Sequence, residues 1–215
     1  MENLVSLRSL FLDYMMVNTN KEIQKGGHVF GGVIIRKPKN LSLSACNFQE
    51  DVPIFEILAV GTNRRHLNPL WHGEIDCINK HFVNLAEKKY TLDKDEEIYM
   101  IASHRPCLMC TYSISWVPRL TNVYYVFDYD ETNESFDMPT DIIQWDKYMA
   151  HAFQCNDSKA PYEIIGESNK ERSFYKLAMS KLLKAELAFE YLKMFEVVKK
   201  VEKEIKFDDK ELLTI

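Results

Sequence analysis

Apolar positions along the chain alternate between short continuous runs, typical of buried strands, and stripes with a helical period. Over residues 3–17 they recur three and four positions apart, which predicts an amphipathic helix that ends at the Gly pair 26–27. The continuous runs predict strands at residues 29–37, 54–61, 96–103, 122–127 and 162–166, the first two forming a hairpin with a long loop.

Two further helices are expected between these strands. Ile75, Ile78, Phe82 and Leu85 share one helical face, which predicts a helix over 72–88 with that face buried. A second helix is predicted over 106–117, where a proline occupies the first turn. Strands that alternate with helices are typical of parallel units in a covered sheet. We therefore predict an α/β fold with three layers, in which helices cover both faces of a mixed sheet of about five strands.

The C-terminal part differs in character from the rest. Apolar residues from Leu183 to Ile205 recur every three or four positions among many Lys and Glu, which predicts a long amphipathic helix. This helix either packs on the surface of its own domain, the preferred interpretation, or pairs with another subunit. We expect a catalytic domain at 1–166 and a helical extension at 167–215, with a short helix possible at 141–153.

Composition and charge narrow the class of protein. Of the 215 residues, 46% are hydrophobic and 27% charged, which is ordinary for a soluble globular protein. Five cysteines, an odd number, and no secretory signal favour a reducing compartment, so we expect the cytoplasm. No apolar run is long enough to span a membrane. Lys and Arg number 27 against 32 Asp and Glu, and this acidic balance disfavours a nucleic-acid partner.

Two short motifs, each at the start of a predicted helix, carry candidate chemistry: His72-Gly73-Glu74 and the segment 106–110 with its two cysteines. Cys107 and Cys110 lie three positions apart, so one helix start can present both thiolates to the same ion. With His72 they make three nitrogen and sulfur ligands, the number typical of a catalytic zinc site. Glu74, which is not a ligand, can move the proton of an activated water. A dithiol redox pair is the alternative for the cysteines.

These motifs follow the order H-x-E…P-C-x-x-C, and over roughly residues 1–130 the sequence resembles the zinc-dependent cytidine and deoxycytidylate deaminase-like superfamily. The segments FGGVIIR, VGTN and PCLMC are similar to the branch of guanine deaminases, fungal cytosine deaminases and tRNA adenosine deaminases. The resemblance implies a cytidine deaminase-like fold, one Zn²⁺ per subunit on His72, Cys107 and Cys110, Glu74 as proton shuttle, and a homodimer or larger oligomer. It also implies that Asn63 binds the substrate.

The function expected from this resemblance is hydrolytic deamination of a small guanine- or cytosine-like base or nucleoside, with release of ammonia. Deamination of adenosine in tRNA is an alternative that the acidic charge disfavours, and a catalytically inactive scaffold subunit is another. Asn63 could instead stabilise a turn. Trp71 is either a wall of the substrate site or core filling.

The remaining candidates have simpler interpretations. His104 and Arg105 are expected as solvated loop residues, with contact to the substrate as the alternative. The three other cysteines, Cys46, Cys77 and Cys155, are expected to be small buried residues.

Overall fold

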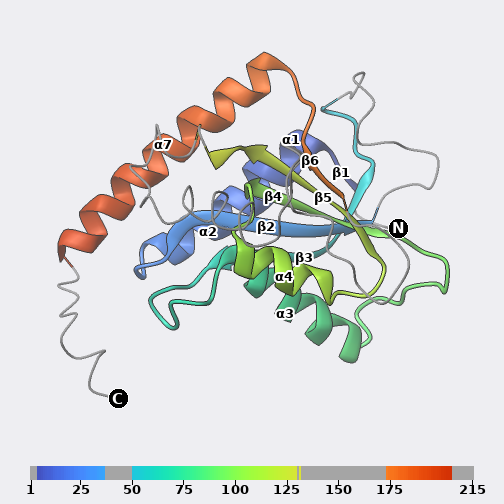
Figure 1. Cartoon of the computed structure of the whole chain (residues 1–215). Helices are drawn as coiled ribbons and strands as arrows, with labels where there is room; N and C mark the ends of the chain where they lie inside the picture. Colours follow the sequence, from blue (N-terminus) through green and yellow to red (C-terminus); the bar gives the residue numbers. More distant parts are fainter. Residues whose placement is uncertain (1–3, 37–49, 130, 132–172, 205–215) are drawn as a thin grey trace, which may run out of the picture.

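The computed structural model describes residues 4–36, 50–129, 131 and 173–204 (Figure 1). The strands are β1 (Leu4–Val5), β2 (His28–Arg36), β3 (Phe55–Asn63), β4 (Ile98–His104), β5 (Leu120–Phe127) and β6 (Ser173–Lys176). The helices are α1 (Leu7–Ser9), the π-helix η1 (Leu10–Met15), α2 (Met16–Ile23), α3 (Gly73–Ala86), α4 (Leu108–Ser115) and α7 (Lys181–Glu204).

The described strands form one mixed sheet of six strands in the order β1-β3-β2-β4-β5-β6. β2 runs antiparallel to β3 and to β4, which confirms the predicted hairpin, whereas β4, β5 and β6 are parallel. β6 lies at 173–176, and the strand predicted at 162–166 falls outside the described residues. The predicted α/β class with a mixed sheet is confirmed, and β1 and β6 are two strands that the sequence does not predict.

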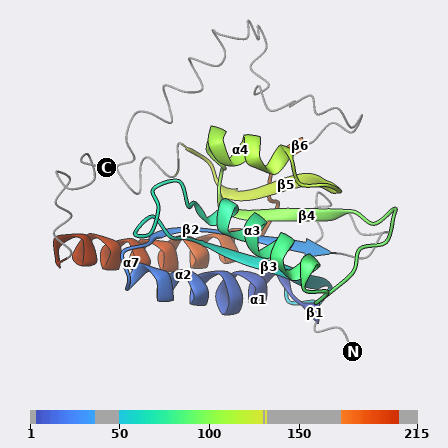
Figure 2. The ribbon, with the colours of Figure 1, turned by 90° about the horizontal axis from the view of Figure 1, so that it is seen from below.

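Helices cover both faces of the sheet (Figure 2). On one face, α1, η1, α2 and α7 pack with β2 in a core that includes Phe11, Met15 and Tyr191. On the other face, α3 and α4 pack with β3, β4 and β5 around Cys77 and Ile114. The chain thus has the three layers that the sequence predicts.

The long C-terminal helix α7 packs on its own sheet, which agrees with the preferred interpretation of its apolar stripe. Leu183, Leu187 and Tyr191 are almost fully buried in the core shared with α1 and α2. The position at which we expected a domain boundary, residue 166, lies outside the described residues, as does the helix considered at 141–153. Among the described helices, none has a stretch of apolar residues sufficient to cross a membrane.

The face of α3 that is buried differs from the predicted one. Ile78 is buried, but Phe82 is 43% exposed, and the buried face is completed by small and polar residues that include Glu74 and Cys77. The cause is the close approach of α3 to β3 at Gly61. A Cβ atom at Gly61 would lie 2.2 Å from the backbone nitrogen of Cys77, so large side chains have no room at this contact.

This contact makes Gly61 a sensitive position. We expect Gly61→Ala to lower the free energy of unfolding by about 3 kcal/mol, because the backbones of α3 and β3 must separate to admit the methyl group. Gly32→Ala is the matched control, since its Cβ would meet Glu74 at an ordinary 3.6 Å. Urea unfolding of the two variants measures the difference, and equal stability would contradict the close packing.

Candidate active site

Three potential metal ligands meet at the beginnings of α3 and α4, which lie side by side on one face of the sheet (Figures 1 and 2). His72 is the N-cap residue of α3, Cys107 is the N-cap residue of α4, and Cys110 lies in the first part of α4. The Nδ1 atom of His72 is 3.5 Å from the Sγ atoms of both cysteines. All three ligand atoms lie within 4.8 Å of one another.

The local sequence explains why these side chains converge. Pro106 lies one residue before the N-cap of α4, outside the helix and not in its first turn as the sequence predicts. His72 and Cys107 both have extended backbones, so the chain turns into a helix directly after each. Helix N-termini carry partial positive charge, which favours thiolates at this place.

The geometry of the three side chains fits zinc. With bonds of about 2.3 Å to sulfur and 2.0 Å to nitrogen, a tetrahedral zinc ion places these atoms about 3.5 Å apart. This is the separation found between His72 Nδ1 and each sulfur atom. One imidazole and two thiols are also a donor set that zinc prefers. His72, Cys107 and Cys110 therefore could hold a zinc ion.

The two thiols differ in acidity. Hydrogen bonds from Cys110 and His72 lower the pKa of Cys107 to about 4. The hydrogen bond to Cys107 and burial raise the pKa of Cys110 well above its usual value. The hydrogen bond with Cys107 in turn raises the pKa of His72. Cys107 is therefore the more acidic of the two thiols.

Glu74 is the second residue of α3 and lies beside these ligands. Its side chain is buried, and its Oε2 atom accepts a hydrogen bond from Cys110 Sγ at 3.5 Å. Burial and the nearby charge of Cys107 raise the pKa of Glu74 to about 7. A carboxyl group with this pKa can take up and release a proton near neutral pH.

The residues expected to bind the substrate are engaged within the protein. Asn63 ends β3, and its Oδ1 atom accepts the backbone N–H of Arg65 at 3.1 Å, which is the turn contact considered as the alternative. Trp71 is half-buried, and its Nε1 atom donates to Asp76 at 3.1 Å. The structure brings His72, Glu74 and the two cysteines together, whereas substrate binding by Asn63 and Trp71 stays a prediction.

The expectation that His104 and Arg105 are solvated loop residues is wrong. His104 is the last residue of β4 and is buried, with its ring edge-on to Phe30 at 4.9 Å and to Tyr191 at 5.1 Å. Arg105 forms an ion pair with Asp128 at 3.1 Å and is largely buried. Two of these neighbouring rings come from β2 and α7, far away in the sequence, and Phe127 of β5 adds a third at 5.1 Å.

Burial of His104 gives a testable dependence of stability on pH. Burial lowers the pKa of His104 to about 3, so between pH 3 and 6.5 the unfolded chain binds a proton that the folded chain does not. Stability therefore rises with pH across this window, by up to about 1.4 kcal/mol per pH unit for one such group. In His104→Gln, the slope of unfolding free energy against pH should fall, as urea unfolding at several pH values would measure. An unchanged slope would contradict this assignment.

The remaining residues of interest differ in how well the sequence predicts them. Cys77 is fully buried, as predicted, whereas Cys46 and Cys155 lie outside the described residues. The sequence patterns do not single out Asp76 and Arg64, although Asp76 contacts both Arg64 and Trp71 in the connection before α3. An acidic residue in the first turn of a helix is ordinary, so nothing in the sequence marks Asp76 as special.

Known structures share the fold of this chain. Guanine deaminase from Nitrosomonas europaea is 13% identical, with a TM-score of 0.55 over 91% of this chain and 88% of that one. The protein NE0047 in complex with 2,6-diaminopurine is 14% identical, with a TM-score of 0.53 over 90% of this chain and 85% of the other.

A tRNA wobble-position deaminase overlaps more loosely, with 17% identity and a TM-score of 0.43 over 83% of this chain and 99% of that one. No protein-family model matches the sequence, and no curated protein matches it. At these identities the likeness of the first two structures shows the fold. The chain has the cytidine deaminase-like α/β fold, with a His/Cys/Cys group that could bind a metal ion where two of its helices begin.

Proposed function

We propose that the protein is a zinc-dependent hydrolytic deaminase that acts on a small guanine- or cytosine-like base or nucleoside. One observation carries the proposal: the buried carboxyl group of Glu74 lies 3.5 Å from Cys110. Cys110 belongs to the His/Cys/Cys group that could hold zinc. The shared fold adds support, because the similar structures include a guanine deaminase and a protein bound to 2,6-diaminopurine.

The roles of the residues follow from their positions. His72, Cys107 and Cys110 would hold zinc, which supplies Lewis acidity that lowers the pKa of water to about 7. Glu74 takes a proton from the attacking water and delivers it to the ring nitrogen beside the amine-bearing carbon. The hydroxyl oxygen bonds to that carbon, Glu74 transfers the second water proton to the amine, and the carbon–nitrogen bond breaks. The products are a ring carbonyl and ammonia.

The raised pKa of Glu74 suits this double role. A group that must both accept and return a proton works best when its pKa lies close to the operating pH. Burial raises the pKa of Glu74 above its usual value, whereas an exposed carboxyl group would stay ionised and would return the proton poorly.

Ammonia release from a panel of substrates tests the proposal. Zinc-loaded protein is incubated with guanine, cytosine, adenine, 2,6-diaminopurine, their nucleosides and tRNA, with Glu74→Ala as control. We expect release from a guanine- or cytosine-like compound. Inosine formed only in tRNA would favour the tRNA alternative, and no release above the control would favour the scaffold. The expected homodimer and cytoplasmic location stay predictions.

A further inference from the structure

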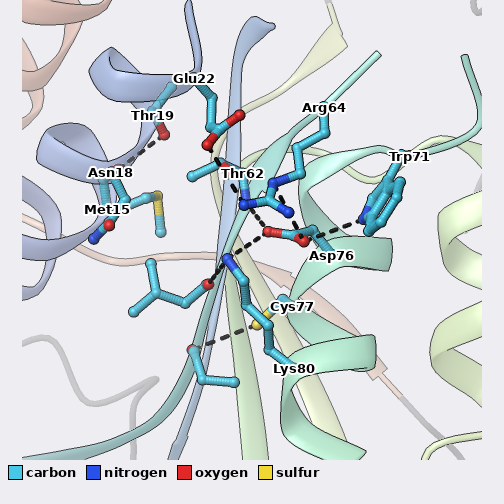
Figure 3. A network of polar contacts seen from close by, with 12 residues as sticks. Met15, Asn18, Thr19, Glu22, Thr62, Arg64, Trp71, Asp76, Cys77 and Lys80 are labelled. Atoms are coloured by element: carbon cyan, nitrogen blue, oxygen red, sulfur yellow. Dashed lines mark hydrogen bonds and ion pairs between the residues drawn. The ribbon is translucent and has the colours of Figure 1, made fainter. Parts of the chain in front are cut away.

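The Asp76 side chain, in the first turn of α3, is buried at the centre of a polar network (Figure 3). Its Oδ2 atom accepts the backbone N–H of Thr62 at 3.0 Å and contacts Lys80 Nζ at 2.7 Å. Its Oδ1 atom accepts Trp71 Nε1 at 3.1 Å and lies 3.7 Å from Arg64 Nε. One carboxylate thus joins the end of β3, the start of α3 and the connection between them.

The connection at residues 64–72 is closed at its own ends. The Arg64 N–H donates to the Trp71 carbonyl oxygen at 2.8 Å, and the Arg64 guanidinium carbon lies 5.7 Å from the Trp71 ring centroid. Arg64 also contacts Glu22 of α2 at 3.5 Å, and Arg65 pairs with Glu202 of α7. His72 follows Trp71 directly, so whatever holds Trp71 also limits where His72 can lie.

We propose that Asp76 is a positioning residue, which fixes the 64–72 connection to α3 and thereby holds His72 in place for the metal. Three of its contacts lie within the connection or directly before it, whereas only Lys80 belongs to its own helix. Groups that orient metal ligands without touching the metal commonly change affinity when they are altered. The part of the inference that concerns the metal rests on the proposed zinc site.

Hydrogen exchange on metal-free protein tests whether Asp76 fixes the 64–72 connection, independently of the metal. Asp76→Asn keeps the shape of the side chain but removes the charge that Lys80 and Arg64 need. We expect amide exchange over residues 62–72 to become at least about tenfold faster, because these amides lose their common anchor. The matched control is Glu56→Gln, which removes a carboxylate paired with Arg36 elsewhere on β3 and should leave this exchange unchanged.

Zinc release into a chelator tests the link to His72. We expect release from Asp76→Asn to be about tenfold faster than from the unchanged protein, and release from Glu56→Gln to be unaffected. Trp71→Phe should accelerate release through the lost Nε1 hydrogen bond. The double variant of Asp76→Asn with Trp71→Phe should release zinc no faster than Asp76→Asn alone, since both act through one contact.

The two measurements separate the possible failures. The inference is overturned if Asp76→Asn leaves exchange over 62–72 unchanged, or if zinc leaves it no faster than it leaves Glu56→Gln. It is also overturned if Glu56→Gln loses as much global stability in urea unfolding as Asp76→Asn does and shows the same faster exchange and zinc release. If the unchanged protein binds no zinc, the proposed function fails, and the exchange experiment still decides whether Asp76 holds the connection.

Discussion

Replacing Glu74 by glutamine is expected to lower the rate of ammonia release about a thousandfold, with zinc still bound. Glutamine has nearly the same shape as the carboxyl group, but it can neither take a proton from water nor return one. Because Glu74 lies outside the His/Cys/Cys group, its replacement should leave the metal ligands in place.

The measurement compares ammonia release and zinc content in the same samples. Glu96→Gln is the matched control, since it makes the same carboxyl-to-amide change at a residue that pairs with Arg36 and lies outside the site. It should keep both full activity and full zinc content. If Glu74→Gln retained most of its activity, Glu74 could not be the proton carrier and the mechanism would fail.

Replacing Cys110 by alanine is expected to abolish zinc binding and activity together. Two remaining ligands hold zinc much more weakly than three, and Cys110 also hydrogen-bonds Glu74. The change should also remove the stabilisation by added zinc, which amounts to about 2.7 kcal/mol at a zinc concentration one hundred times Kd.

Cys77 provides a closely matched control for this experiment. Both thiols are fully buried, but Cys77 lies on the side of α3 that packs against β3 and donates to the Ala59 carbonyl oxygen. Cys77→Ala should keep one zinc ion per chain, as measured by metal analysis and by the shift in unfolding temperature with zinc. Loss of zinc in both variants, or in neither, would contradict the assigned ligand set.

The sequence predicts the metal-binding group well, for a physical reason. Helix starts that follow strands gather on one side of a sheet, so a His at one start and two Cys at another can meet although 35 positions separate them. The spacing of Cys107 and Cys110 then places both sulfur atoms beside the same ring. Spacing and element order alone carry this part of the prediction.

Other features depend on contacts that sequence patterns do not encode. The prediction of the buried face of α3 is wrong because periodicity detects large apolar residues, whereas close packing at Gly61 selects small and polar ones. A polar residue such as His104 is expected in solvent from its type alone, but residues of β2 and α7 cover it. The sequence does not single out Asp76, since its proposed positioning role depends on partners from three different segments.

The position of α7 has a consequence for the order in which the molecule can fold. The residues of the proposed zinc site all lie before residue 111. The core on the face of the sheet covered by α2 and α7, however, includes residues from Leu183 to Val198. A chain emerging from a ribosome therefore carries the complete set of candidate ligands long before it can close that core. Contacts between α2 and α7 join elements from the two ends of the described chain. Such distant pairings slow folding and leave apolar surface uncovered until they form.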